Sequence, residues 1–402
     1  MPLVPVTEHQ AAVAALLAAP PSEPELLPAA EALGRVLAEP VVAREQLPSF
    51  ANSAMDGYAV RAADVAGASP DSPVRLPVGG DIPAGAPVGT LAPGVALRIM
   101  TGAPVPDGAD AVVEVEATDG GTTTVEIREA REAGTFVRKA GSDVRAGDEV
   151  LPRGSVLGAA QVGILHALGV ATVACVRRPR VLVLSTGSEL AVDPEPGSGR
   201  IRDANGPMLA AAVLDAGAVA VPHLSTTDDV PTFLAALEAA LPDVDLVLTS
   251  GGVSAGAYEV VKDALGPRGV SFTKVAMQPG MPQGIGTYDG VPVVCLPGNP
   301  VSSLVSFEVF VRPALRRRAG NPHPERPVVS ATLTEPLTSP AGRRQLRRGR
   351  LDRAAGTVTP WGPAGSGFLG WYAGADCLVD VPADATDVSA GAVIDVWDLT
   401  VG

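Results

Sequence analysis

The chain has 402 residues, of which 46% are hydrophobic, so it is too long for one core and predicts two to four domains. Its formal net charge of −14 and its aromatic content of 3% argue against a general nucleic-acid-binding protein. Such a protein attracts the phosphate backbone with positive charge and stacks bases on aromatic rings. A small anionic ligand stays compatible with this composition, because loop dipoles and a few arginines can bind it locally.

The cysteines, and the lack of long apolar runs, indicate in which cellular compartment the protein works. Cys175, Cys295 and Cys377 lie far apart and form no CxxC pair, so we expect buried free thiols in a reducing environment. No signal-peptide pattern is present at the N-terminus. No uncharged apolar run reaches about 18 residues, so no membrane span is predicted. We therefore expect a cytoplasmic protein.

The N-terminal half reads as helical and then β-rich. Residues 6–39 show helical spacing of Ala and Leu, with Thr7 and Ser22 as N-caps and Leu26–Leu37 as a second helix. From Val60 to Val137 short valine and threonine runs alternate with glycine and proline, which predicts strands and turns. Residues 158–168 predict one further short helix.

From residue 180 strands alternate with helices. The expected elements in order are strand Val181–Ser185, helix Pro207–Ala216, strand Ala218–Leu224, helix Val230–Leu241, strand Leu246–Thr249, helix Tyr258–Leu265, strand Val291–Cys295 and helix Ser303–Arg318. This alternation predicts a parallel, doubly wound sheet, which binds ligands beyond the carboxyl ends of its strands. Residues 326–402 return to short β runs and predict a separate small β domain.

Two glycine-rich loops follow strands of this sheet. The first is Ser250–Gly256 and the second is Leu296–Ser303, and each leads into a predicted helix. Such a loop points backbone N–H groups outward at the positive end of the helix, which suits phosphate. An ordinary strand-to-helix turn is the alternative for either loop alone, but two loops in one unit favour anion binding.

Other site motifs are absent or out of context. There is no GxxxxGK[ST] loop and no serine-nucleophile elbow, and the GxGxxG at Gly365–Gly370 lacks a strand–turn–helix setting. The histidines, His9, His166, His223 and His323, have no metal-ligand spacing. Any metal is therefore expected to be a hard cation such as magnesium, held by carboxylate and phosphate oxygens.

Polar residues that suit such a site lie in loops. They are Asp56, Thr101, Asp143, Glu189 and Asp228. Taken singly, each carboxylate is also typical of a cap or a turn. Acidic residues at several strand ends beside phosphate-binding loops indicate a magnesium–phosphate site.

Five motifs in order, SAMDGYA, RIMTGAPVP, STGSEL, SGGVSAG and LPGNPVSSLVSFEVFVRPAL, resemble those of the molybdopterin molybdenumtransferase family. This family includes bacterial MoeA and the C-terminal domain of gephyrin, and the resemblance runs from about Thr7 to the C-terminus. It implies insertion of molybdate into adenylylated molybdopterin (molybdopterin-AMP) with release of AMP and a need for Mg²⁺. It also implies a homodimer whose site is shared between subunits. Molybdopterin adenylyltransferase and molybdoenzyme maturation factors are the expected partners, with no nucleic acid and no membrane.

The resemblance also implies an α/β multidomain fold with four domains. These are an elongated helical and extended N-terminal domain (residues 1–45 and 143–178), an inserted β-rich domain (46–142), a doubly wound, MogA-like molybdopterin-binding domain (179–325) and a small C-terminal β domain (326–402).

The family's site residues carry over where the motifs match. Asp56, Thr101 and Asp143 match catalytic positions supplied by the dimer partner, and Glu189 and Asp228 match carboxylates near the phosphates and the magnesium ion. Ser302, Arg348 and Ser366 match positions for the molybdate oxyanion, where hydroxyls and guanidinium groups suit a tetrahedral anion. The full set expected to bind the substrate is Ser250, Gly251, Gly252, Ser254, Gly256, Glu259, Pro297, Gly298, Asn299, Pro300, Ser302, Arg348 and Ser366.

The sequence departs from the family pattern at four places. Ser188 replaces the carboxylate of STGDEL, Glu259 replaces an aspartate, and Gly370-Trp371 stand where paired serines are common. The typical KPGKP reads Gln278-Pro279-Gly280-Met281-Pro282, so both lysines are missing.

The missing lysines leave two alternatives. In the first, Gln278 and Met281 weaken oxyanion binding. In the second, another residue supplies the missing positive charge, either Lys274 or an arginine in the segment 343–350, with Arg348 as the first candidate.

Two other functions stay open at this point. The lost lysines favour a weakly active or inactive paralogue that acts as a dimeric scaffold, as gephyrin does for receptor tails. A sugar-phosphate or nucleotide enzyme on the same sheet is a third reading, since fold alone does not fix chemistry. The retained acidic residues favour the molybdenum insertase. The sequence does not distinguish molybdate from tungstate, identify the molybdoenzyme served or any scaffold partner, or reveal a second copy.

Overall fold

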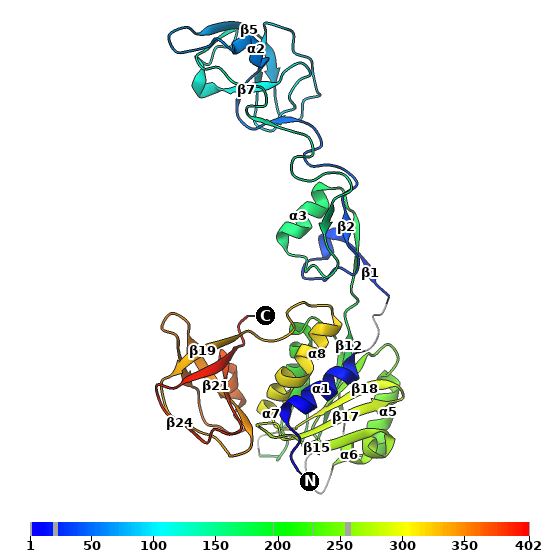
Figure 1. Ribbon diagram of the computed structural model, residues 1–402. Helices are drawn as coiled ribbons and strands as arrows, with labels where there is room; N and C mark the ends of the chain where they lie inside the picture. Colours follow the sequence, from blue (N-terminus) through cyan, green and yellow to red (C-terminus); the bar gives the residue numbers. More distant parts are fainter. Residues whose placement is uncertain (1, 19–22, 196, 227, 254–258, 402) are drawn as a thin grey trace. The chain divides into compact units, whose positions relative to one another are not determined.

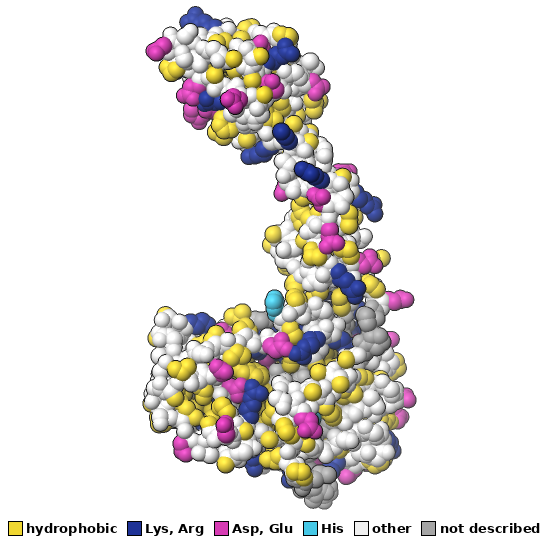
Figure 2. All heavy atoms as spheres, viewed as in Figure 1, with side chains coloured by type: hydrophobic (Ala, Val, Ile, Leu, Met, Phe, Trp, Pro, Cys, Tyr) yellow, Lys and Arg dark blue, Asp and Glu magenta, His cyan; other side chains and the backbone are white. Residues whose placement is uncertain are grey.

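The protein is described by a computed structural model that covers residues 2–18, 23–195, 197–226, 228–253 and 259–401. The chain divides into two compact units, each described here by itself. Unit 1 comprises Met1–Glu25 and Val176–Gly402, and unit 2 comprises Leu26–Cys175. Among the described residues, no helix has the length and apolar character needed to cross a membrane. Acidic and basic side chains are interspersed on the face shown in Figure 2.

Unit 1 contains a six-stranded sheet in the order β13–β12–β14–β18–β17–β15 (Figure 1). Its strands are β12 (Arg180–Thr186), β13 (Val219–Thr226), β14 (Leu246–Ser250), β15 (Val270–Lys274), β17 (Pro282–Tyr288) and β18 (Val291–Leu296). The first four strands of this order are parallel, which confirms the predicted doubly wound sheet. β17 and β15 continue it antiparallel and were not expected. Gly284 and Gly286 interrupt the apolar pattern of β17, so it does not read as a strand.

Successive residues of each parallel strand face opposite sides of the sheet, as the two-residue period of a strand requires. Val181 and Val183 pack with α1 (Val6–Leu17) and α4 (Asn205–Asp215). Leu182 and Leu184 pack on the other side with α5 (Val230–Ala240) and α6 (Val260–Leu265). Both faces are buried, so these strands are almost entirely apolar.

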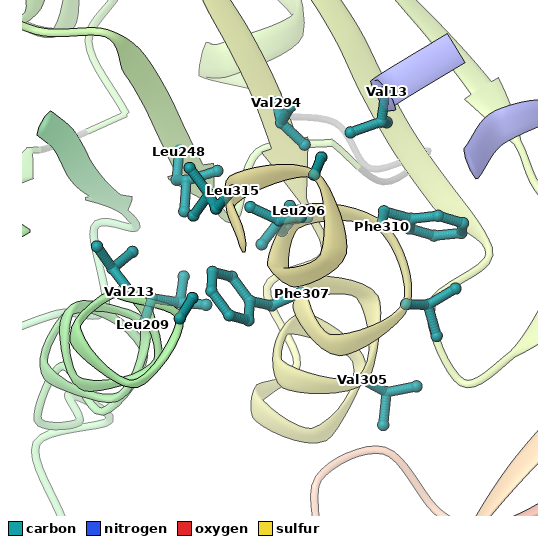
Figure 3. Packing of buried hydrophobic residues seen from close by; sticks show 14 of the residues in the cluster. Val13, Leu209, Val213, Leu248, Val294, Leu296, Val305, Phe307, Phe310 and Leu315 are labelled. Atoms are coloured by element: carbon teal, nitrogen blue, oxygen red, sulfur yellow. The ribbon is translucent and has the colours of Figure 1, made fainter. Parts of the chain in front are cut away.

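The predicted helix Ser303–Arg318 is a longer helical run of three parts. It consists of α7 (Pro300–Ser306), a π-helical turn at Phe307–Val311 and α8 (Arg312–Arg318). The turn lies just before Pro313, which cannot donate a helical hydrogen bond. Figure 3 shows Phe307 directed from this run toward Leu209 and Val213 of α4, where the side chains are fully buried.

Of the two helices predicted over residues 6–39, the structure contains only the first. α1 is a helix, but it begins at Val6 after Pro5 with no side-chain cap, so Thr7 is not its N-cap. The second helix over Leu26–Leu37 is wrong: the chain forms β1 (Glu25–Pro28) and a 3₁₀ turn at Ala29–Glu31. Pro28 disfavours helical backbone at Leu27, and Gly34 has φ +73°, which a helix does not allow. Ser22, the other predicted cap, lies outside the described residues.

Unit 2 is rich in strands, as predicted. Its main sheet has the order β7–β4–β6–β5–β8, formed by β4 (Gly57–Val60), β5 (Val74–Ile82), β6 (Ala96–Ile99), β7 (Ala111–Glu114) and β8 (Thr124–Ile127). The shorter elements are α2 (Ala62–Val65), α3 (Ala159–Ala167), β2 (Val41–Val42), β3 (Asn52–Ser53), β9 (Val137–Arg138), β10 (Glu149–Leu151) and β11 (Thr172–Cys175). Tyr58 of β4 is 2% exposed at the centre of one of its cores.

The C-terminal segment of unit 1 forms a second six-stranded sheet. Its strands are β16 (Met277–Gln278), β19 (Val328–Leu333), β21 (Arg344–Asp352), β22 (Thr357–Pro360), β23 (Cys377–Val381) and β25 (Val393–Asp398), accompanied by β20 (Leu337–Thr338), β24 (Asp387–Val388) and α9 (Leu369–Ala373). β16 pairs in parallel with β21, with Met277 opposite Arg344 and Gln278 opposite Gln345. The loop that carries Gln278 and Met281 is therefore held against the C-terminal sheet.

The first prediction concerns His9 of α1, which is 2% exposed and lies edge-on to Phe310, with 4.6 Å between ring centroids. Burial lowers the pKa of His9 from 6.5 to about 4, and its Nε2 bonds to no described residue. The unfolded chain therefore takes up this proton near pH 6.5, and the folded chain only near pH 4. Stability should fall as the pH drops through this window.

Urea unfolding followed by tryptophan fluorescence tests this, since Trp361, Trp371 and Trp397 all lie in unit 1. Between pH 7.5 and 5 the native chain should lose about 2 kcal/mol more than a His9→Leu variant, because one pKa unit is worth about 1.4 kcal/mol. An equal decrease in the free energy of unfolding in both proteins would show that protonation of His9 does not cause the pH dependence.

Candidate active site

Three loops meet at the carboxyl ends of the parallel strands β12, β14 and β18. The loops start at Gly187, Gly251 and Pro297, and parallel pairing brings the strand ends to one edge of the sheet. Asn205, the first residue of α4, connects two of them. Its Nδ2 donates to Ser250 Oγ at 2.9 Å and to the Gly298 carbonyl at 2.6 Å. Both predicted anion-binding loops therefore belong to one site.

The backbone of the loops requires glycine. Gly251 has φ +98°, and a Cβ there would lie 2.6 Å from the Thr186 carbonyl oxygen. A Cβ at Gly187 would lie 2.5 Å from a carboxylate oxygen of Glu189. The start of the loop after β14 thus approaches the end of β12 too closely for any residue but glycine at position 251.

A first cavity of about 430 Å³, named here the carboxylate pocket, opens between these loops. The predicted residues that line it are Glu189, Asp228, Ser250, Gly251, Gly252, Gly298, Asn299 and Pro300. Asp228 accepts a hydrogen bond from the Ser188 backbone N–H at 2.8 Å, so this carboxylate also fixes the loop after β12. Glu189 is exposed, and its carboxylate has no hydrogen-bond partner among the described residues, which leaves it free for a ligand.

Among the residues of this pocket that sequence reasoning missed are two polar ones, Asp203 and Asn205. Asp203 accepts the Gly206 backbone N–H at 3.0 Å through Oδ1, while its Oδ2 is buried with no partner in the described part of the chain. Their position directly before and at the start of α4, which follows a predicted strand, was the signal available in the sequence.

A second cavity of about 400 Å³, the serine pocket, adjoins the first and shares Val253, Gly298 and Asn299 with it. Ser302 and Ser366 both line it, together with Pro297. The altered loop residues Gln278 and Met281 form part of its wall. The Gln283 side chain anchors this loop to α7. Its Nε2 donates to the Gly280 carbonyl at 2.6 Å and to Ser306 Oγ at 2.7 Å.

Two predicted substrate-binding residues line neither pocket. Arg348 is 4% exposed, and its guanidinium donates to the carbonyls of Pro363 and Gly365. It therefore fixes the segment that carries Ser366, and burial lowers its pKa. Glu259 is buried at the start of α6. Ser254 and Gly256 lie outside the described residues.

In unit 2 the structure brings Asp56 and Thr101 together. Asp56 Oδ1 accepts the Thr101 backbone N–H at 2.6 Å and the Thr101 hydroxyl at 2.8 Å. The backbone hydrogen bond from Thr101 is the main cause of the lowered pKa of Asp56. Asp56 also lines a cavity of about 180 Å³ with Arg98. Asp143 is exposed, and no hydrogen bond joins its side chain to another described residue.

Another cavity, of about 850 Å³, lies between the N-terminal segment and the C-terminal sheet of unit 1. Its charged lining includes Arg344 and Asp380, which pair with each other. No predicted site residue lines it, so its size does not make it the active site. No group of three or more histidine, cysteine, aspartate or glutamate side chains suited to hold a metal occurs within the described part of the chain.

The fold and these pockets define a class of protein: a multidomain protein whose doubly wound sheet carries glycine loops, carboxylates and serines at the carboxyl ends of its strands, an arrangement that suits an anionic ligand. Comparison with known families narrows this class. Residues 4–169 match the MoeA N-terminal region (domain I and II), residues 182–317 match the probable molybdopterin binding domain, and residues 330–399 match the MoeA C-terminal region (domain IV).

Similar proteins agree with these matches. The chain is 54% identical to molybdopterin molybdenumtransferase 2 of Mycobacterium tuberculosis, over 98% of this chain and 99% of that one. It is 40% identical to molybdopterin molybdenumtransferase 1 of the same organism, over 97% and 98%. A solved molybdopterin biosynthesis MoeA protein from Pyrococcus horikoshii superposes with a TM-score of 0.83 at 31% identity, covering 99% of both chains. The chain belongs to the molybdopterin molybdenumtransferase (MoeA) family.

Proposed function

We propose that this protein is a molybdopterin molybdenumtransferase, which inserts molybdate into adenylylated molybdopterin and releases AMP. The observation that carries the proposal is the pair of adjoining pockets, one lined by glycine loops and carboxylates and the other by serines. Family membership along nearly the whole chain supports the same reaction. A paralogue that serves only as a scaffold is not favoured, because Glu189 and Asp228 line one pocket together with both glycine loops.

The pockets suit the two parts of the substrate. The Gly252 N–H of this turn would bind phosphate, since the Gly251 N–H already donates to the Leu296 carbonyl at 3.2 Å. Asn205 holds the turn to the Pro297–Pro300 loop. The hydroxyls of Ser302 and Ser366 would donate to a tetrahedral oxyanion in the neighbouring pocket. The shared wall between the pockets would keep the reacting groups close together.

Magnesium is the metal that fits the carboxylate pocket. Glu189 and Asp228 both line it, and Mg²⁺ is commonly held by one or two carboxylates plus substrate phosphates and water. These two residues would hold the ion. When bound, Mg²⁺ would neutralise phosphate charge and favour the departure of AMP.

We further propose that the four domains have the boundaries 1–45 with 143–178, 46–142, 179–325 and 326–402. The protein would work in the cytoplasm as a homodimer, with Asp56, Thr101 and Asp143 of one subunit serving the pockets of the other. Molybdopterin adenylyltransferase would supply its substrate, and maturation factors of molybdoenzymes would receive its product.

The function is tested by complementation. The gene should restore nitrate reductase activity in a bacterial strain that lacks its own molybdenum insertase, and a Glu189→Gln version should not. Failure of the native gene, with the protein expressed and folded, would count against the proposal and favour the scaffold.

The dimer gives a separate prediction. Light scattering should yield about twice the chain mass of 40.6 kDa. If the site is shared, mixing inactive Asp56→Ala and Glu189→Gln variants should restore part of the activity, because some mixed dimers have one intact site. A fully active monomer would contradict the prediction.

A further inference from the structure

The short helix α9 carries large side chains on its solvent-facing side as well as on its buried side. Leu369 and Tyr372 pack into the apolar core that includes Phe307. Phe368, which directly precedes the helix, and Trp371 are 46% and 42% exposed and are named here the aromatic pair. Residues three apart lie on one side of a helix, so the two rings share the solvent-facing side. They are the only exposed Phe, Tyr or Trp side chains among the described residues of unit 1.

Trp371 departs from the family pattern, in which paired serines are common where this chain has Gly370-Trp371. The core contacts of α9 come from its other side, so the fold does not require an indole at this position. A large ring that stays partly in water, where a serine could stand, exposes apolar surface at a cost in free energy. Such a surface is typical of a place that contacts a ligand.

Both rings of the aromatic pair are held from behind. A Cβ at Gly362 would lie 2.5 Å from Cδ2 of Trp371, and a Cβ at Gly365 would lie 2.5 Å from Cε2 of Phe368. Each ring therefore rests directly on glycine backbone. Trp361 meets Trp371 edge-on, with 5.1 Å between ring centroids. Because the rings are already ordered, little conformational entropy is lost when a ligand stacks on them.

The turn beneath the aromatic pair also forms a wall of the serine pocket. Gly365 lines this pocket, as do its neighbours Ala364 and Ser366. Arg348 fixes the turn by donating to the carbonyls of Pro363 and Gly365. None of these residues lines the carboxylate pocket. The aromatic pair therefore borders the serine pocket and not the carboxylate pocket.

We propose that the aromatic pair stacks on the pterin ring of the substrate and contributes to substrate selection. The inference rests on the proposed function, in which the oxyanion occupies the serine pocket and the AMP phosphate occupies the carboxylate pocket. The pterin carries the dithiolene that must meet the oxyanion, so the pterin is the planar ring next to the serine pocket. Adenine is joined to the phosphate and belongs to the other pocket. Indole and phenyl faces suit stacking with a planar heteroaromatic ring.

Binding of free molybdopterin, with neither AMP nor molybdate present, tests the inference. Equilibrium dialysis without oxygen, with the ligand measured by the fluorescence of its oxidised pterin, gives the affinity of each folded variant. Trp371→Leu should weaken binding about fivefold or more, the lower end of what stacking on one aromatic ring is worth. Trp371→Phe should keep most of the affinity, and Phe368→Leu should lower it as a second variant. The affinity for AMP, measured in the same way, should not change.

Trp397→Leu is the matched control. Trp397 is a half-buried tryptophan of β25 that also lies beside an arginine, with the guanidinium carbon of Arg344 5.4 Å from its ring centroid, but it lines neither pocket. Molybdopterin affinity should stay within about twofold of the native value. An equal loss in Trp397→Leu would overturn the inference, as would unchanged molybdopterin affinity in both Trp371→Leu and Phe368→Leu. A loss of affinity for AMP alone would also overturn it, because the pair would then contact adenine.

AMP release separates this inference from the proposed function. With molybdopterin-AMP as substrate, Trp371→Leu should raise KM more than it lowers kcat, because stacking holds the substrate both before and during the reaction. A native protein that binds molybdopterin through the aromatic pair but releases no AMP would refute the insertase and keep the pterin site. AMP release by a Trp371→Leu variant with native molybdopterin affinity would do the reverse.

Discussion

Replacing Glu189 with Gln should reduce AMP release about a hundredfold or more while leaving the protein folded. The Glu189 carboxylate lines the carboxylate pocket and bonds to no described residue, so the folded state loses no contact. The reaction would lose a magnesium ligand, and stabilisation of phosphate charge by a metal is worth several kcal/mol, each 1.4 kcal/mol being about tenfold in rate.

Asp228→Asn should have a comparable effect on AMP release with a small additional effect on stability. Its Oδ2 accepts the Ser188 N–H, and the amide can preserve that bond only in one orientation. Glu195→Gln is the control, since Glu195 is exposed in the same part of unit 1 and lines neither pocket. Near-native turnover in Glu189→Gln, measured by nucleotide chromatography at saturating Mg²⁺, would move the magnesium site elsewhere.

The second large effect is expected for Asn205→Ala. This change removes both hydrogen bonds that join the loop after β14 to the loop after β18, at Ser250 and Gly298. A shift of about 1 Å in a positioned group can cost about a hundredfold in rate, so kcat/KM for AMP release should fall by roughly that factor. The melting temperature should change by only a few degrees, because Asn205 lies outside the apolar cores.

Asn321→Ala provides the matched control for Asn205. Asn321 also bonds through its side chain, accepting the His323 N–H at 2.8 Å, but it is a half-buried residue that follows α8 and lines neither pocket. It should leave kcat/KM unchanged. If Asn205→Ala retained native kcat/KM, the two loops would keep their arrangement without this bridge.

The sequence predicted the parallel sheet and its loops because their signals are local. Val181–Ser185 and Leu246–Thr249 are apolar runs followed by glycine, and those patterns fix both strand and turn. β17 has no such signal, since glycines interrupt it and its pairing with β18 decides its structure. The helix expected over Leu26–Leu37 is absent because Pro28 favours extended backbone at Leu27 and Gly34 adopts φ +73°, and these outweigh the Ala/Leu spacing.

In the candidate site, too, the sequence indicates what depends on local motifs and not what depends on long-range contacts. Glu189 and Asp228 were identified from motifs, and the structure places both in one pocket. The bridge made by Asn205 spans 45 and 93 residues of sequence, so no local pattern indicates it. Arg343 lines the serine pocket because β21, which follows it, pairs with β16, and no local sequence pattern indicates this long-range register.

The most direct test of the whole account is AMP release by the purified protein supplied with molybdopterin-AMP, molybdate and Mg²⁺. We expect one AMP for each molybdenum atom incorporated, and no AMP when either molybdate or Mg²⁺ is left out. AMP formed at the same rate without molybdate, or bound molybdopterin-AMP that stays intact with all components present, would contradict a molybdenumtransferase.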